Sequence, residues 1–377
     1  MSDLPDPDRV EGAPHPRETP RLIGQSAAET AFLDAYNGER LHHGWLLTGP
    51  RGIGKATLAW RIARFLLATP PADDGGLFGA PEPPNSLDIA PDHPVARRLQ
   101  ALSDPGLCLI RRGPNDKGDA LSNDIRVDQV RKLKSFFALS ATDGGRRVVI
   151  VDSADELNTS AANALLKELE EPPARVTMLL ISHQPSKLLP TIRSRCRELR
   201  LGTLDPDQMA QALAQAGAET PDPVALAELS GGSVGEALRL TNLGGLELYS
   251  ELVGLMATLP RLDRPRALKF AEAAAGKAAR PRYDLMLALL DLFLARLARA
   301  GVMGPPANEA AKGEAALLAR LSPDLYAARA WAETAETLGA RARHARAVNL
   351  DPASLILDTV LRIDQTAATL AARQAYV

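Results

Sequence analysis

The chain has 377 residues, of which 45% are hydrophobic and 24% charged, and its net charge is −2. This length exceeds one ordinary hydrophobic core, so we expect two or three domains in a soluble globular protein. The near-neutral charge excludes a whole-molecule attraction to nucleic acid, so any DNA contact has to come from a local patch. The two cysteines, Cys108 and Cys196, exclude a disulfide framework and a four-cysteine zinc site and suit a reducing cytosol.

The first part of the chain predicts a leader followed by a helix, a strand and a second helix. Residues 1–20 are rich in proline and acidic groups and lack an apolar core, so we expect a flexible leader and no secretory signal. Residues 23–35 follow a helical pattern, and the apolar run from Trp45 predicts a buried strand. Apolar residues then recur at helical spacing up to a stop at Pro70.

Strand and helix signals alternate over the next part of the chain. An irregular insertion is expected at residues 70–94, where proline, glycine and aspartate are frequent. The expected strands cover residues 107–110, 148–151, 176–181 and 197–201. One helix is expected to begin near Asp124, and another is expected to cover residues 159–171. Apolar strands that alternate with helices predict a parallel sheet covered on both faces.

From residue 205 onward the pattern is helical. This change of pattern predicts three domains: an α/β nucleotide-binding-like domain over 21–203, a small helical lid over 204–243 and an all-α domain over 244–377. The longest apolar stretch, residues 285–298, is interrupted by Asp291 and Arg296 and falls short of the ~18 to 20 residues that cross a bilayer. We therefore expect a buried helix there and no membrane span.

The most informative stretch is the glycine loop GPRGIGKAT over residues 49–57. It fits the pattern G-x-x-x-x-G-K-[S/T], in which backbone N–H groups cradle the phosphates of a nucleotide. Its candidate nucleotide-binding residues are Gly49, Gly52, Gly54, Lys55 and Thr57. The position after the lysine should carry a hydroxyl for Mg²⁺ but is Ala56, and Thr57 points elsewhere because one helical step turns a side chain by roughly 100°.

A second candidate position lies where the strand over 148–151 ends. Asp152 is placed to help hold Mg²⁺, as in working ATPases of this type. The next residue should be an acid that activates water, but it is Ser153, which has no basicity near neutral pH. Asp155 and Glu156 are nearby acids that are candidates to replace it. The sequence thus predicts a nucleotide-binding fold that has lost part of its chemistry.

Three strings, HHGWLLTGPRGIGK, NALLKELEEPP and TIRSRC, occur in this order in residues 42–196. In order and spacing they resemble the clamp-loader AAA+ family, and within it the delta-prime type of subunit of bacterial DNA polymerase III. The resemblance covers residues 20–240. It implies a hetero-pentameric ring with gamma/tau-like ATPase subunits and a delta-like subunit, which loads a sliding clamp onto primed DNA in the cytoplasm. It also implies that residues 244–377 form an oligomerisation collar.

The resemblance assigns roles to single residues. Arg195, in the S-R-C string, corresponds to an arginine finger that projects into the ATP site of the neighbouring subunit and stabilises the transferring phosphoryl group. The alternative is an ordinary surface salt bridge. Ser182 corresponds to a sensor residue at the end of a strand that faces the nucleotide crevice, and His183 is expected to line that crevice or the surface.

Departures from the family pattern point to a subunit that does not hydrolyse ATP. Besides Ala56 and Ser153, Gly235 stands where the G-S-x-R-x-A-L pattern of the family's ATPases has a sensing arginine. Many relatives also carry a four-cysteine zinc module, whereas here only Asp92 and His93 remain, so we expect no metal. Weak binding of ATP or ADP stays open.

Two other functions are compatible with the same residues. One is an active ATPase of a clamp loader or a related replication or repair motor, which would use Lys55, Thr57, Asp152 and Glu156. The other is a helical interaction protein with a vestigial nucleotide fold, unrelated to replication. ATP hydrolysis by the isolated chain would favour the first, and co-purified partners would identify the second.

Overall fold

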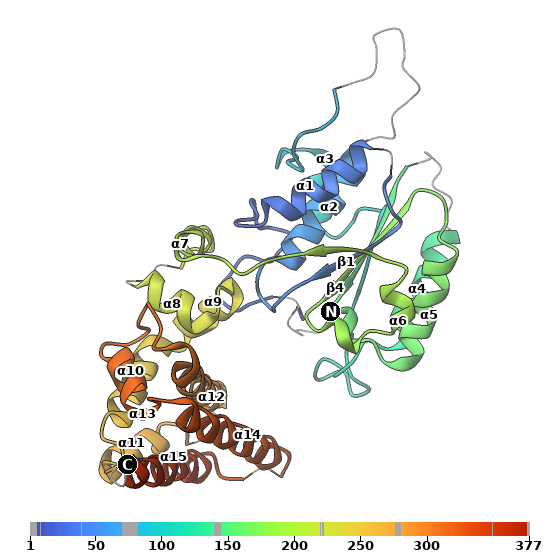
Figure 1. Cartoon of the computed structure of the whole chain (residues 1–377). Coiled ribbons are helices and arrows are strands. Elements are labelled where there is room, and N and C mark those ends of the chain that lie inside the picture. The colour runs from blue at the N-terminus through green and yellow to red at the C-terminus, as the bar shows by residue number, and fades with distance from the viewer. Residues whose placement is uncertain are drawn as a thin grey trace. The chain divides into compact units, whose positions relative to one another are not determined.

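The computed structural model describes residues 6–7, 9–38, 40–69, 82–138, 145–218, 220, 222–275, 280–348 and 350–374 (Figure 1). The expected helix stop at Pro70 and much of the expected insertion lie outside these residues. Contacts within the chain divide it into two compact units. The first contains residues 1–218 and 233–235, and the second contains residues 219–232 and 236–377.

A five-stranded parallel sheet forms the centre of the first unit, with the strand order β2-β3-β4-β1-β5. Its strands are β1 (Gly44–Thr48), β2 (Leu107–Arg111), β3 (Arg147–Asp152), β4 (Val176–Ser182) and β5 (Arg197–Arg200). Every residue of β1 and β4 is buried, because these two strands lie inside the sheet and both of its faces are covered. The predicted parallel sheet and its strands are confirmed.

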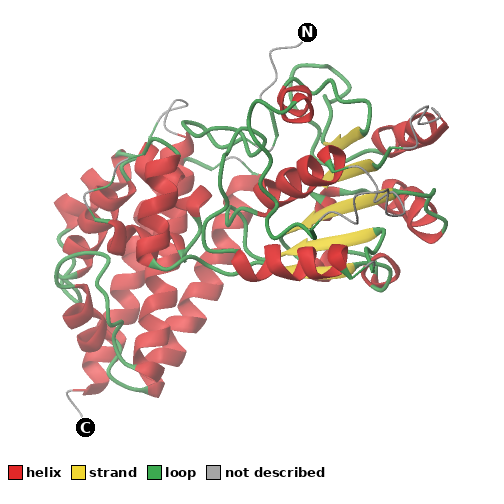
Figure 2. Ribbon diagram, turned by 90° about the horizontal axis from the view of Figure 1, so that it is seen from above, coloured by secondary structure: helices red, strands yellow, loops and turns green. Residues whose placement is uncertain are grey.

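Helices lie on both sides of this sheet (Figure 2). They are α1 (Ser26–Asn37), α2 (Lys55–Ala68), α3 (Pro94–Gln100), α4 (Val127–Ala138), α5 (Thr159–Glu170) and the short α6 (Pro190–Arg193). Successive side chains of a strand point to opposite faces. Trp45 and Leu47 of β1 therefore pack in one core with α1 and α2, whereas Leu46 packs in a second core with α4 and α5.

Helix α3 begins where the expected irregular segment over residues 70–94 ends, and the sequence patterns did not predict it. Pro94 occupies the first turn of the helix, where its missing N–H costs nothing. The ring nitrogen Nδ1 of His93 accepts a hydrogen bond from the backbone N of Val95 at 3.2 Å, which caps the helix. Within the described residues, no group of three or more His, Cys, Asp or Glu side chains could hold a metal ion.

The leader also differs from the expectation of a flexible segment, because its described residues pack on α2. His15 is 1% exposed and lies edge-on against Trp60, with 6.0 Å between the ring centroids. The guanidinium of Arg64 donates to the backbone O of Arg17 at 2.7 Å, and that of Arg61 donates to the backbone O of Pro20 at 3.1 Å. Hydrogen bonds from Arg61 and Arg64 of α2 to backbone carbonyls thus anchor a segment whose own composition predicts no structure.

The rest of the chain is helical. It forms α7 (Pro206–Gln215), α8 (Pro223–Ser230), α9 (Val234–Asn242), α10 (Gly245–Met256), α11 (Arg264–Glu272), α12 (Arg280–Met303), α13 (Glu314–Leu321), α14 (Leu325–Ala347) and α15 (Pro352–Gln374). Among the described helices, none has both the length and the apolar character to cross a membrane. Helix α7 belongs to the first compact unit and α8 to the second, so a separate lid domain over 204–243 stays a prediction.

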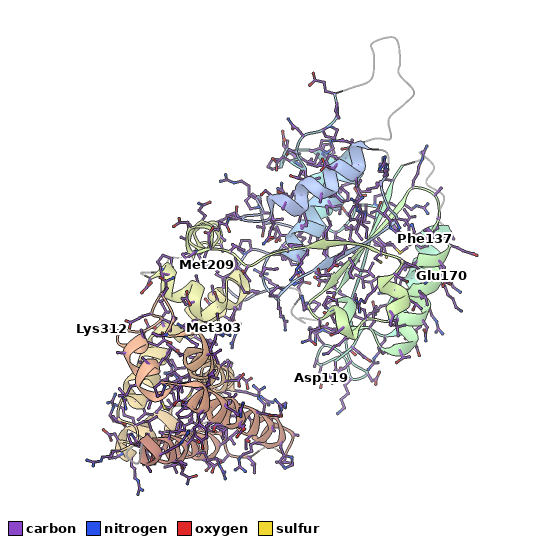
Figure 3. All side chains as sticks on the ribbon, viewed as in Figure 1. Asp119, Phe137, Glu170, Met209, Met303 and Lys312 are labelled. Carbon is purple, nitrogen blue, oxygen red and sulfur yellow. The ribbon has the colours of Figure 1, made fainter. Side chains whose placement is uncertain are left out.

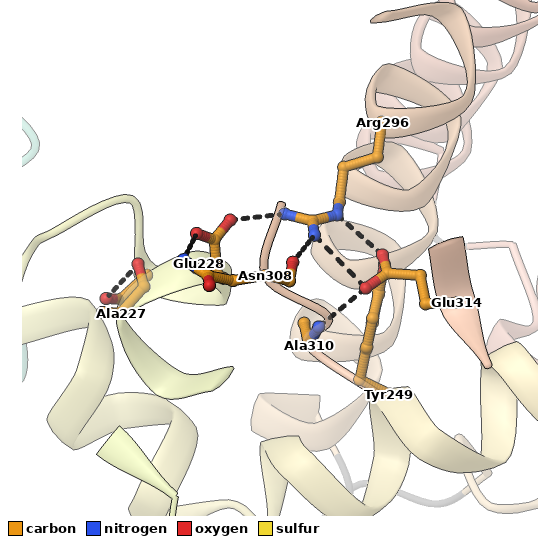
Figure 4. Close-up of polar contacts among 8 residues, drawn as sticks. Ala227, Glu228, Tyr249, Arg296, Asn308, Ala310 and Glu314 are labelled. Carbon is orange, nitrogen blue, oxygen red and sulfur yellow. Dashed lines mark hydrogen bonds and ion pairs between the residues drawn. The ribbon is translucent and has the colours of Figure 1, made fainter. Parts of the chain in front are cut away.

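A buried ionic cluster joins four segments of the helical unit (Figure 4). Arg296 of α12 binds both carboxylate oxygens of Glu314, at 2.7 and 3.2 Å, and reaches Glu228 of α8 at 3.2 Å. Glu314 is 0% exposed and also accepts hydrogen bonds from the hydroxyl of Tyr249 at 2.5 Å and from the backbone N of Ala310 at 2.7 Å. Burial and then the Glu314 charge raise the pKa of Tyr249, so its hydroxyl stays protonated and donates.

Candidate functional site

The glycine loop connects the end of β1 to the start of α2, the strand–loop–helix context that the phosphate-loop pattern requires. Gly49, Gly52 and Gly54 have φ values of 136°, 77° and 101°, which side chains with a Cβ rarely adopt. Lys55 is the first residue of α2. Ala56 is half-buried at the start of the helix and offers no hydroxyl, while Thr57 is 8% exposed.

The ammonium group of Lys55 is bound by the carbonyls of its own loop. Nζ donates to the backbone O of Gly49 at 2.7 Å and to the backbone O of Pro50, and the residue is 3% exposed. Burial lowers the pKa of Lys55 to about 8, and the charges of Asp152 and Asp155 oppose that shift. In this arrangement, the lysine that would contact the β and γ phosphates is used inside the loop.

Asp155 holds the strand ends together and is not placed as a free base. It lies in a short turn, η1 (Ala154–Glu156), directly after β3. Its carboxylate accepts hydrogen bonds from Ser182 Oγ at 2.5 Å, from the backbone N of His183 at 2.5 Å and from the backbone N of Gln184 at 3.1 Å. Ser153 Oγ donates to the same carboxylate at 3.3 Å. The sensor-like Ser182 is therefore bound to Asp155, and it is 0% exposed.

The other two candidates for acid–base chemistry at this edge are also engaged or unsuitable. Glu156 forms an ion pair with Arg112, with 2.8 Å between Oε2 and Nε. Burial, and then the charge of Lys55, lower the pKa of His183 to about 4, so its ring is neutral at pH 7 and a weak base. In this structure, both acids considered as replacements for the water-activating residue have other partners: Asp155 binds the strand ends and Glu156 binds Arg112.

The turn that carries Gly235 docks directly on the glycine loop, within the first compact unit. The backbone N of Gly235 donates to the O of Gly52 at 2.9 Å, and Ser233 Oγ donates to the O of Arg51 at 2.7 Å. A Cβ on Gly235 would lie 2.9 Å from the Cα of Gly52, closer than such contacts occur. The position that the resemblance assigns to a sensing arginine thus makes a close backbone contact that only glycine permits.

Restoring an arginine at this place is expected to damage the loop and not to restore a site. Gly235→Arg and Gly235→Ala should each lower the free energy of unfolding by about 1–3 kcal/mol, because the new Cβ overlaps the Gly52 backbone. Thermal unfolding of the isolated chain measures the loss of stability, and an ATP-binding assay shows whether the site has been restored. The control is Gly202→Ala, where an added Cβ meets nothing within 4 Å. A Gly235→Arg protein with wild-type stability and tight ATP binding would contradict the prediction.

Arg195 lies beside the start of β1, whereas the glycine loop follows the end of β1. It sits in the turn between α6 and β5, and its backbone O would be 3.0 Å from a Cβ on Gly44, where β1 begins. The loop begins at Gly49, after β1 ends, and five residues of strand at about 3.3 Å each separate the two places by roughly 16 Å. An arginine side chain cannot span that distance, so Arg195 does not reach the loop of its own chain.

The side chain of Arg195 is 37% exposed, and its guanidinium has two partners in this structure. Nη2 lies 2.9 Å from Glu170 Oε1, and Nη1 donates to the backbone O of Thr191 at 3.1 Å. The sequence-based alternative of a surface salt bridge thus describes its present contacts.

A family model described as DNA polymerase III, delta subunit, matches residues 24–205. A DNA polymerase III subunit delta′ from Pseudomonas aeruginosa is 39% identical over 230 residues, covering 60% of this chain and 64% of that protein. Within residues 24–205 the chain is therefore similar to subunits of DNA polymerase III. A DNA polymerase III subunit tau/gamma from Haemophilus influenzae is 29% identical over 65% of this chain and 34% of that protein. The chain therefore spans less than two thirds of the length of either relative.

Two solved structures show a weak likeness to the chain. A DNA polymerase III gamma subunit-related protein from Thermotoga maritima covers 89% of this chain and 99% of its own, with 16% identity and a TM-score of 0.37. RuvB, the Holliday junction branch migration motor of Thermotoga maritima, covers 76% of this chain and 80% of its own, with 18% identity and a TM-score of 0.36. The fold assignment rests on the sheet order and the loop rather than on these likenesses.

Sequence patterns did not identify several residues that hold this region together. Ser233 binds the loop, and the side chain of Gln25 joins the O of Ile53 at 3.3 Å to the O of Gly202 at 2.8 Å. Thr48, at the end of β1, donates to Glu198 at 2.5 Å. Each is a polar residue whose partner is distant in the sequence, and a single sequence carries no signal for such pairs.

Proposed function

We propose that this chain is the delta-prime-type subunit of a DNA polymerase III clamp loader, that it does not hydrolyse ATP itself, and that it supplies Arg195 to a neighbouring ATPase subunit. One observation carries the proposal. Backbone groups of this chain bind the lysine and the backbone of its glycine loop, while Arg195 lies at the opposite ends of the strands. A guanidinium in that position can act only on a nucleotide held by another chain.

The chemistry of the loop supports the absence of hydrolysis. Hydrolysis needs a Mg²⁺ ligand after the lysine and a residue that orients or activates water. Ala56 cannot supply the first, and Ser153 donates its hydrogen bond to Asp155 instead of acting as a base. Lys55 and Asp152 remain, so weak nucleotide binding is compatible with the proposal.

The chemistry of an arginine supplied in trans is electrostatic. As the phosphoryl group transfers, negative charge spreads over its oxygens, and a guanidinium with several N–H donors stabilises that charge. The partners that we propose are gamma/tau-type ATPase subunits and a delta-type subunit in a hetero-pentamer. The complex would place a sliding clamp on primed DNA, with the C-terminal helices as its oligomerisation collar.

Reconstitution with gamma/tau-type and delta-type subunits of the same organism tests this function. Without partners, the chain should release inorganic phosphate from ATP at the background rate. Clamp-stimulated and DNA-stimulated ATP turnover of the complex should depend on adding the chain. Steady phosphate release by the isolated chain, abolished by Lys55→Ala, would instead support the active-ATPase alternative.

A further inference from the structure

The three sequence strings that characterise the chain meet at one place in the structure. His43 and Gly44 come from the first string, Glu170 from the second, and Arg195 from the third. Figure 3 shows Glu170 at the end of α5. The contacts around Arg195 therefore bring together residues that lie far apart in the chain.

Two partners hold the two terminal nitrogens of the Arg195 guanidinium. The carboxylate of Glu170 takes Nη2 at 2.9 Å, and the carbonyl of Thr191 takes Nη1 at 3.1 Å. A planar guanidinium held at two of its nitrogens has a defined orientation, and its remaining N–H groups stay available as donors. The side chain is 37% exposed, so those donors can face a neighbouring chain.

Glu170 stands where helix stability disfavours an acid. It is the last residue of α5, and Glu171 follows as the cap. The partial negative charge at the C-terminus of a helix opposes a carboxylate there by about 0.3–1 kcal/mol. The acid therefore weakens its own helix, and the partner that the structure gives it is Arg195.

Residues at and just before the start of β1 contact both segments that carry Arg195 and Glu170. His43 donates from Nε2 to the backbone O of Leu169 at 3.1 Å, which ties down the end of α5 one residue before Glu170. Burial, and then the neighbouring His42, lower the pKa of His43, which favours the neutral ring. A Cβ on Gly44 would lie 3.0 Å from the O of Arg195 and 3.2 Å from the sulfur of Cys196. Glycine at this position lets the Arg195 turn approach the strand.

We propose that Glu170 is a positioning residue for Arg195, and that Gly44 sets the height of the turn that carries it. This inference rests on the proposed function, because positioning matters only where Arg195 acts on a neighbour's nucleotide. Glu170 orients the guanidinium before the neighbour binds, so less conformational freedom is lost when the arginine meets the developing charge.

The test compares Glu170→Gln with Glu171→Gln in the reconstituted complex. Both variants remove one negative charge from the end of α5, but only the first removes the carboxylate that binds Arg195. We expect Glu170→Gln to lower kcat by about tenfold at the one ATP site that receives Arg195, measured by single-turnover phosphate release, with KM unchanged within about twofold, because nucleotide binding belongs to the neighbour. Glu171→Gln should keep the wild-type kcat. Gly44→Ala should also lower kcat, since the turn has to shift.

Assembly of each variant, measured by size-exclusion chromatography, shows whether the complex is intact. If Arg195→Ala lowers turnover but Glu170→Gln behaves like Glu171→Gln, the positioning role is wrong and the proposed function stands. A rise in turnover with Glu170→Gln would show that the carboxylate restrains the arginine, which also overturns the inference. If Arg195→Ala itself leaves turnover unchanged, the proposed function is the part that fails.

Discussion

Replacing Arg195 with alanine is expected to slow ATP hydrolysis by about 10³-fold or more at the one site that receives it. In the proposed complex, the ATP sites that other subunits serve keep their own arginines. The sharpest readout is therefore the burst of phosphate release in a single-turnover experiment on the reconstituted complex. Its amplitude should fall by one site per complex, while the remaining sites react at the wild-type rate.

The same variant is expected to fold and assemble normally. Arg195 and Glu170 form a pair that is 37% and 43% exposed, and exposed pairs contribute only about 0–1 kcal/mol to stability. Arg193→Ala is the matched control, because it removes the same charge from an exposed position two residues earlier in the chain. An unchanged burst amplitude with Arg195→Ala, in a complex of normal size, would refute the role of this arginine.

The fold was predictable because its signals are local. The β-branched run of β3 and the apolar run of β4 each predict a buried strand from consecutive residues. The glycine loop then places a helix after β1, and the alternation of strands and helices leaves a parallel sheet as the consistent arrangement. Helix α3 was missed because it follows a proline-rich stretch and owes its start to the His93 cap.

The losses at the site were also predictable, since each is the absence of a required residue at a known spacing. The contacts that these positions make in the structure were not predictable from the sequence. Asp155 binds Ser182 over 27 positions, and Ser233 binds Arg51 over 182 positions. Such contacts depend on how the backbone folds back on itself, and neither hydrophobic period nor motif spacing encodes them. The leader shows the same limit, because the partners that hold residues 9–20 lie mainly on α2.

The buried cluster around Arg296 is the second place where one substitution should have a large effect. Arg296 is 7% and Glu314 0% exposed, so both charges have left water and depend on each other. Removing one partner of such a pair leaves an uncompensated buried charge, which costs about 3–5 kcal/mol. Removing both charges together can cost far less, because the desolvation of each disappears with it. The cluster thus joins α8, α10, α12 and α13 at the expense of tolerance to single changes.

Arg296→Met and Glu314→Gln are each expected to lower the free energy of unfolding of the helical unit by about 3–5 kcal/mol, and the double variant should lose less than their sum. Trp331 lies in this unit and is 0% exposed, whereas Trp45 and Trp60 lie in the other, so a Trp45→Phe/Trp60→Phe background makes Trp331 fluorescence report on the helical unit alone. Arg341→Met is the control, because its pair with Asp358 is 45% and 38% exposed and should be worth no more than about 1 kcal/mol. Equal losses from Arg296→Met and Arg341→Met would mean that burial adds nothing to this pair, and that the contact between α8 and α12 depends on apolar packing instead.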